Sequence, residues 1–189
     1  MSTGKTDIEG HFIHACCEYD CLAGNGVIGL EIVDQLEDFD SIICPYGGGS
    51  NLLGNASALK QLKPNVKCYA CEVDVAAPLY ISLRKGVPSK VDEWQRTYID
   101  GMNGKEMFPC MWKMATNLVQ DSILVNTDQI SSALRLMLNK NKILAEGAGA
   151  ATVAAAMSEK VPEGKIVCVI SGGNIDQKTL MTILNGQTP

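Results

Sequence analysis

Short runs of apolar, often β-branched residues alternate along this chain with longer segments whose apolar residues recur at helical spacing. Runs typical of strands occupy residues 41–45, 66–72, 122–126 and 165–170, and the last of these reads as a buried strand. Segments typical of helices occupy residues 26–36, 52–62, 76–84, 107–119, 148–159 and 178–184, and one more helix is predicted to begin at Thr127. Strands that alternate with helices form a parallel sheet covered by helices. We therefore predict an α/β fold with an open, mostly parallel sheet and helices on both faces.

Composition narrows the class of protein. The 189 residues favour one domain or a small pair of subdomains, and 46% hydrophobic with 20% charged residues is ordinary for a globular chain. Sixteen basic against 21 acidic residues argue against a nucleic-acid partner. No apolar run is long enough to span a membrane, and the N-terminus lacks the apolar core of a signal peptide. We expect a cytoplasmic protein with reduced thiols and a disordered lead over residues 1–10.

The strongest local feature is a run of three glycines, Gly47, Gly48 and Gly49, between the strand at 41–45 and the next helix. Glycines let the backbone approach an anion closely, and a helix N-terminus supplies free N–H groups and a positive dipole end. Ser50 adds a hydroxyl donor. The pattern predicts a phosphate site, although a plain tight turn would have the same location.

The glycine spacing limits which phosphate ligand fits. It does not match the Gly-x-Gly-x-x-Gly pattern of dinucleotide folds, and these glycines are not followed by the Gly-Lys-Ser/Thr of a nucleoside triphosphate loop. Glu72 ends the next strand, where a ribose-binding acid would lie. A nucleotide-binding protein therefore remains an alternative.

A second glycine-containing turn, 171–174, follows the last predicted strand. Ser171 stands at the carboxyl end of that strand, where its hydroxyl can reach a ligand that binds at this edge of the sheet. The simpler interpretation of Ser171 is a capping residue ahead of a turn.

Taken together, six stretches resemble the C-terminal part of the fold-type-II pyridoxal-phosphate enzymes, in the threonine/serine dehydratase and serine racemase group. They occur in the family's order and spacing from about His11 to Leu184. The stretches are 23–31, 45–54, 63–64, 98–101, 146–150 and 171–176.

The resemblance implies roles for individual residues. Gly47, Gly48, Gly49 and Ser50 match the loop that cradles the cofactor phosphate, with a serine in place of the fourth glycine and Asn51 in place of an apolar residue. Ser171, which precedes Gly172, matches the residue that hydrogen-bonds the pyridine nitrogen. Glu146 matches a glutamate close to the cofactor ring, and it would serve equally as a carboxylate at a helix start. The predicted cofactor contacts are Gly47, Gly48, Gly49, Ser50, Asn51, Glu146, Ser171 and Gly172.

The resemblance also implies a reaction. In the family, a hydroxy-amino acid loses its Cα proton and its β-hydroxyl and yields a 2-oxo acid and ammonia. The family's Schiff-base lysine motif and its substrate-carboxylate loop are not found in this sequence, so no catalytic residue is predicted. We expect residues 11–189 to form a partial pyridoxal-phosphate-binding domain without the small domain. A serine racemase-like protein and a non-catalytic remnant that binds a phosphorylated ligand are alternatives.

The remaining expectations concern partners and metals. We expect a small amino-acid substrate, and a homo-oligomer or a complementary chain. The family often has a cation site, for which Glu72 and the carbonyl of Ala76 match two ligands, while Pro78 stands where a carboxylate would complete it and Asp74 is a substitute. Cys68 and Cys71 are predicted to point to opposite faces of a strand as buried thiols. A zinc site is the less favoured interpretation of a cluster made by His11, His14, Cys16, Cys17 and Cys21.

Overall fold

A computed structural model describes residues 9–10, 13–158, 160–161 and 163–189. Four strands form one sheet in the order β3-β2-β1-β4, and every neighbouring pair is parallel. The strands are β1 (Ser41–Pro45), β2 (Lys67–Val73), β3 (Asp121–Val125) and β4 (Ile166–Cys168). The predicted α/β fold with a parallel sheet is confirmed.

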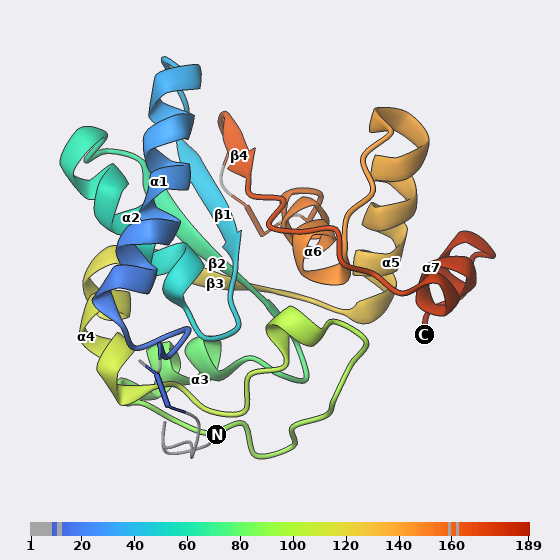
Figure 1. Cartoon of the computed structure of the whole chain (residues 1–189), viewed down its shortest axis with the longest axis horizontal. Coiled ribbons are helices and arrows are strands. Elements are labelled where there is room, and N and C mark those ends of the chain that lie inside the picture. Colours follow the sequence, from blue (N-terminus) through green and yellow to red (C-terminus); the bar gives the residue numbers. More distant parts are fainter. Residues whose placement is uncertain (1–8, 11–12, 159, 162) are drawn as a thin grey trace.

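Helices cover both faces of this sheet (Figure 1). They are α1 (Tyr19–Gln35), α2 (Ser50–Leu62), α3 (Pro78–Lys85), α4 (Pro109–Leu118), α5 (Thr127–Leu136), α6 (Gly147–Ala156) and α7 (Gln177–Leu184). A short 3-10 helix, η1 (Asp100–Met102), and a π-helical turn, η2 (Met137–Asn141), complete the described elements. No helix in the described part of the chain combines the length and the apolar character needed to cross a membrane.

The core has two halves because successive side chains of a strand point to opposite faces. Ile42 and Cys44 of β1 pack with α1, α2 and α4, whereas Ile43 packs with α5, α6 and α7. Cys68 and Cys71 of β2 lie in different halves, as predicted, and both are buried. Burial raises the pKa of the Cys68 thiol to about 11 and also raises the pKa of Cys71.

Most element boundaries agree with the sequence to within two residues. Gly86 ends α3 in the left-handed conformation, as predicted for a C-terminal glycine. Pro78 and Pro109 mark the first turns of α3 and α4, which is why both helices begin two residues later than expected. The predicted end of α6 at Glu159, and residues 1–8 of the predicted lead, lie outside the described residues.

The largest boundary error is at α1, which begins seven residues before the predicted start at residue 26. Gly26 and Gly29, which already belonged to the predicted helix, are packing positions. A Cβ at Gly26 would lie 3.1 Å from the carbonyl oxygen of Gly54 in α2, and a Cβ at Gly29 would lie 3.2 Å from that of Asn55. Contact with α2 therefore outweighs the low helix propensity of glycine.

The interpretation of residues 165–170 as a buried strand is wrong in extent and in burial. Only Ile166–Cys168 form the strand, and all three residues are half-buried. Within the described residues, β4 is an edge strand that pairs with β1 alone. The apolar run predicted the strand but could not show on which side it is uncovered.

Candidate functional site

The turn that joins β1 to α2 lies where the sequence predicted a phosphate loop. Gly49 has φ +98°, which favours glycine, and it directly precedes the first residue of α2, Ser50. The N–H groups of Gly47, Gly48 and Gly49 donate to no other described residue. Together with the first N–H groups of α2, they are available to an anion.

Close packing explains why this turn is built from glycine. A Cβ at Gly47 would clash with the carbonyl oxygen of Gly101, and a Cβ at Gly48 would clash with the thiol of Cys16. A Cβ at Gly49 would lie 2.9 Å from the ring of Tyr46, which is buried. Since no neighbour leaves room for a side chain, the turn presents backbone alone to the ligand side.

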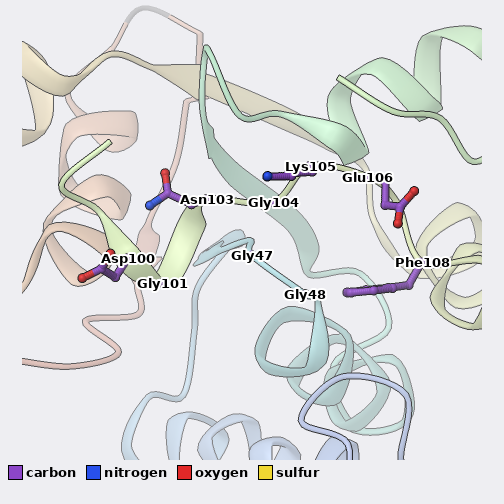
Figure 2. Close-up of a pocket in the computed structure, with 9 residues that line it drawn as sticks. All are labelled: Gly47, Gly48, Asp100, Gly101, Asn103, Gly104, Lys105, Glu106 and Phe108. Carbon is purple, nitrogen blue, oxygen red and sulfur yellow. The ribbon is translucent and has the colours of Figure 1, made fainter. Parts of the chain in front are cut away.

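A cavity of about 420 Å³ lies beside this turn (Figure 2). Gly47 and Gly48 form one wall, and residues from η1 to the start of α4 form the other. The lining residues are Gly47, Gly48, Asp100, Gly101, Asn103, Gly104, Lys105, Glu106 and Phe108. This volume is in the range of small-molecule sites.

Asn103 fixes the shape of the far wall. Its side-chain oxygen accepts hydrogen bonds from the backbone N–H of Thr97 at 2.9 Å and from the Thr97 hydroxyl at 3.0 Å. Its Nδ2 donates to the carbonyl oxygen of Thr97 at 3.0 Å. The polar atoms of Asn103 are thus committed to closing a loop rather than to a ligand.

The second predicted turn packs against the start of α6. The N–H of Glu146 donates to the carbonyl oxygen of Gly172 at 2.9 Å, and a Cβ at Gly172 would lie 2.7 Å from Oε1 of Glu146. A Cβ at Gly149 would lie 3.4 Å from the N of Ser171. Ser171 is exposed, and its hydroxyl makes no hydrogen bond to another described residue. The structure therefore brings Glu146, Ser171 and Gly172 together.

A smaller cavity of about 220 Å³ adjoins Glu146 and is lined by Tyr98, Asp100, Gly101, Glu146, Gly147, Ala148, Asn174, Ile175, Asp176 and Thr179. Asp100 and Gly101 line both cavities, and a Cβ at Gly101 would lie 3.1 Å from the Cβ of Ala148. The phosphate-loop candidate and the start of α6 are thus linked through η1. Gly49, Ser50, Asn51, Ser171 and Gly172 are not among the lining residues of either cavity.

The segment from Tyr98 to Phe108 was missed as a wall of the site. Most of it lies between the predicted helices 76–84 and 107–119, where no helix or strand was predicted. The short match at 98–101 was the available signal, but neither an anion-binding pattern nor a periodic pattern gave it a role. Its contribution follows from a long-range contact between Gly101 and Gly47.

Glu72 lines neither of these cavities and is completely buried. Its carboxylate accepts hydrogen bonds from the N–H groups of Leu79 and Tyr80, at 2.9 and 2.7 Å, and from the Ser122 hydroxyl at 2.6 Å. It therefore caps the first turn of α3 and joins it to β3. Burial raises the pKa of Glu72 to about 7, against the opposing effect of these three donors.

This environment bears on two predictions for Glu72. A buried carboxylate cannot reach a ribose, so the nucleotide interpretation loses its acid. No group of three or more His, Cys, Asp or Glu side chains in the described part of the chain is arranged to hold a metal ion. The cation site at Glu72 and the carbonyl of Ala76 stays a prediction. His11 of the predicted zinc cluster lies outside the described residues.

The expectation that all cysteines are reduced thiols is wrong for one pair. Cys17 and Cys110 form a disulfide across a sequence separation of 93, with a Cα–Cα distance of 6.0 Å. It joins the segment before α1 to the first turn of α4. Cysteine number and assumed compartment gave no information on which thiols the fold brings together.

Comparison with known proteins agrees with this geometry. The profile of the family described as "Pyridoxal-phosphate dependent enzyme" matches residues 5–172. The chain is 36% identical over 179 residues to the L-threonine ammonia-lyase of Geobacter sulfurreducens, covering 92% of this chain and 43% of that protein. It is 32% identical over 188 residues to the serine racemase of Rattus norvegicus, covering 97% and 56%.

Among solved structures, the processed form of threonine deaminase isoform 2 from Solanum lycopersicum superposes with a TM-score of 0.84 at 29% identity, covering 92% of this chain and 48% of that one. The chain thus spans about half the length of the relatives it matches. The matched family depends on pyridoxal phosphate. By sequence, sheet topology and the glycine turn at the end of β1, this chain belongs to the pyridoxal-phosphate-dependent enzymes of fold type II.

Proposed function

We propose that this chain supplies the phosphate- and ring-binding part of a threonine/serine ammonia-lyase. The observation that carries the proposal is the set of three glycine N–H groups, without partners among the described residues, at the N-terminus of α2 and beside the larger cavity. These donors suit the cofactor phosphate, and the turn has no side chains of its own that would block them. When bound, pyridoxal phosphate supplies the electron sink for loss of the Cα proton and of the β-hydroxyl.

In this proposal, the residues of this chain bind and orient the cofactor. Gly47, Gly48, Gly49 and Ser50 hold the phosphate, with Asn51 in the same first turn of α2. Ser171 offers a neutral hydroxyl to the pyridine nitrogen, and Gly172 leaves the space that the Glu146 carboxylate occupies. A neutral partner leaves that nitrogen unprotonated more often than a carboxylate would, which suits β-elimination.

Threonine and serine are the substrates we propose, and 2-oxobutanoate or pyruvate with ammonia are the products. The relatives named serine racemase make racemisation of serine the second candidate. The sequence contains no match to the family's lysine motif, so we propose that this chain by itself does not turn over either amino acid. The cytoplasmic location and the oligomeric state stay predictions.

Binding of pyridoxal phosphate tests the cradle directly. The free chain is titrated with pyridoxal phosphate and with pyridoxal, which lacks the phosphate, by equilibrium dialysis. We expect clear preference for the phosphorylated form and loss of that preference in Gly48→Asp, which adds bulk and a like charge at the turn. Gly24→Asp is the matched control, because a Cβ at Gly24 in α1 meets nothing within 4 Å. Equal binding of both ligands would remove the proposal.

The reaction is tested in a chimera in which this chain replaces the matching part of the Geobacter sulfurreducens ammonia-lyase, which brings its own remaining half. 2-Oxobutanoate from threonine supports the lyase, and D-serine from L-serine supports the racemase. The unmodified chain is assayed in parallel. Turnover by the chain alone would contradict the claim that it lacks the covalent catalyst.

A further inference from the structure

The larger cavity contains one positive side chain among its lining residues, Lys105. The two acids of the same wall have basic partners elsewhere: Asp100 lies 3.4 Å from Nη2 of Arg96, and Glu106 lies 3.3 Å from Nζ of Lys90. Lys105 forms no ion pair with any described acid. Among the described residues, Lys105 is therefore the charged residue of this wall whose charge no ion pair neutralises.

The backbone of Lys105 is fixed, while its side chain is exposed. The carbonyl oxygen of Lys105 accepts a hydrogen bond from the N–H of Val91 at 2.9 Å, and the neighbouring pair Lys90 and Glu106 forms an isolated antiparallel bridge. The ammonium lies 4.1 Å from the centroid of the Trp94 ring. The aromatic ring attracts the cation but offers no hydrogen-bond acceptor to its three N–H groups. The ammonium can therefore leave the ring and bind an oxyanion.

The opposite wall offers donors of the same kind. Gly47 and Gly48 line the cavity across from Lys105, and their N–H groups have no partners among the described residues (Figure 2). A cation on one wall and free N–H groups on the other select a ligand that carries anionic oxygen. An amino-acid substrate with its cofactor brings two such groups, a carboxylate and a phosphate.

We infer that Lys105 is an anion-binding residue of this cavity, whose ammonium moves from the Trp94 ring to the oxyanion of a bound ligand. The inference rests on the proposed function, because it assigns a further residue to the same site. The two sources of the oxyanion, cofactor phosphate and substrate carboxylate, share one chemistry and are separated by the experiment.

The experiment measures binding to the wild-type chain, Lys105→Met and Lys113→Met. Lys113 is an exposed lysine of α4 outside the cavity and serves as the matched control. The probes are inorganic phosphate, pyridoxal phosphate, and threonine added to the chain saturated with pyridoxal phosphate. Tryptophan fluorescence reports the departure of the ammonium, and Trp94→Phe assigns the signal, because the chain has a second tryptophan.

We expect Lys105→Met to lower the affinity for one of the anionic ligands at least tenfold. Lys105→Arg should keep most of the wild-type affinity, and Lys113→Met should leave the affinity unchanged. Weaker phosphate binding assigns Lys105 to the cofactor phosphate. Unchanged phosphate binding with weaker threonine binding assigns it to the substrate carboxylate. Unchanged affinity for every probe overturns the inference and leaves the phosphate cradle intact. A wild-type chain that binds neither phosphate nor pyridoxal phosphate overturns both the inference and the proposed function. Thermal melting of each variant confirms that it is folded.

Discussion

The buried carboxylate of Glu72 makes the stability of this chain depend on pH. The Glu72 pKa is about 7 in the folded protein and returns to its ordinary value of 4.5 when the chain unfolds. Between these two values the folded state binds the proton more tightly than the unfolded state does. The contribution of this group to the free energy of unfolding is therefore greatest below pH 4.5 and is lost as the pH rises through 7.

The size of the effect follows from the difference between the two pKa values. It corresponds to about 3 kcal/mol, since each pKa unit is worth about 1.4 kcal/mol. That is a large part of the roughly 5–15 kcal/mol by which a domain is stable. Glu72→Gln keeps one acceptor oxygen for the three donors and cannot ionise, so this variant should lack the corresponding decrease.

Urea unfolding of the wild type, Glu72→Gln and Glu93→Gln at intervals from pH 4.5 to 8 tests this reasoning. Glu93 is exposed, so its variant controls for the general effect of removing one carboxylate. We expect the wild type and Glu93→Gln to lose about 3 kcal/mol more than Glu72→Gln over this range. Parallel curves for all three proteins would refute the claim that burial raises the Glu72 pKa.

Three other changes test the packing and the covalent structure. Without reductant, thiol titration of the denatured chain should detect six of its eight cysteines, and eight would contradict the Cys17–Cys110 disulfide. Cys17→Ser should lower the free energy of unfolding by up to about 4 kcal/mol, because the disulfide closes a long loop, and urea unfolding measures this loss. Gly54→Ala should cost about 1–3 kcal/mol, since its Cβ would lie 2.9 Å from the N of Gly26, whereas Gly24→Ala should stabilise α1 by about 0.5–1 kcal/mol. Equal melting temperatures for these two alanine variants would disprove the close packing of α1 on α2.

The sequence predicted the sheet and the glycine turn because both are encoded locally. Residues 42–45 are apolar on both faces, as a central parallel strand requires, and β1 spans the predicted residues 41–45. The turn after it needs a left-handed residue, and Gly49 supplies one. The start of α5 at Thr127 was predicted as well, and the structure shows a capping box of Asn126 and Gln129 at that point.

The errors share a different origin, which is contact between segments distant in the sequence. The prediction left out residues 19–25 of α1, where the carbonyl oxygen of Leu22 packs against Gly54 of α2, a helix that begins more than twenty residues later. The pairing of Cys17 with Cys110 and the exposed side of β4 likewise depend on where other elements lie. Local propensity contains no information of this kind, so the start of α1, the disulfide and the burial of β4 could not be predicted.

At the candidate site, glycines are visible as local sequence signals and also mark contacts between distant segments. Gly47, Gly101, Gly149 and Gly172 are scattered over more than 120 residues, yet each leaves space for a different neighbouring segment: η1, α6, the 171–172 turn and the Glu146 carboxylate, respectively. In the sequence alone, a glycine does not show whether a neighbour excludes a side chain at that position. The fold shows what excludes it, and the answers form one connected path from the phosphate-loop candidate to Ser171. Replacing any of the four glycines with alanine should therefore disturb ligand binding by displacing a segment that is remote in the sequence. Because these contacts are long-range, the motifs outlined the site but did not predict its wall at residues 98–108.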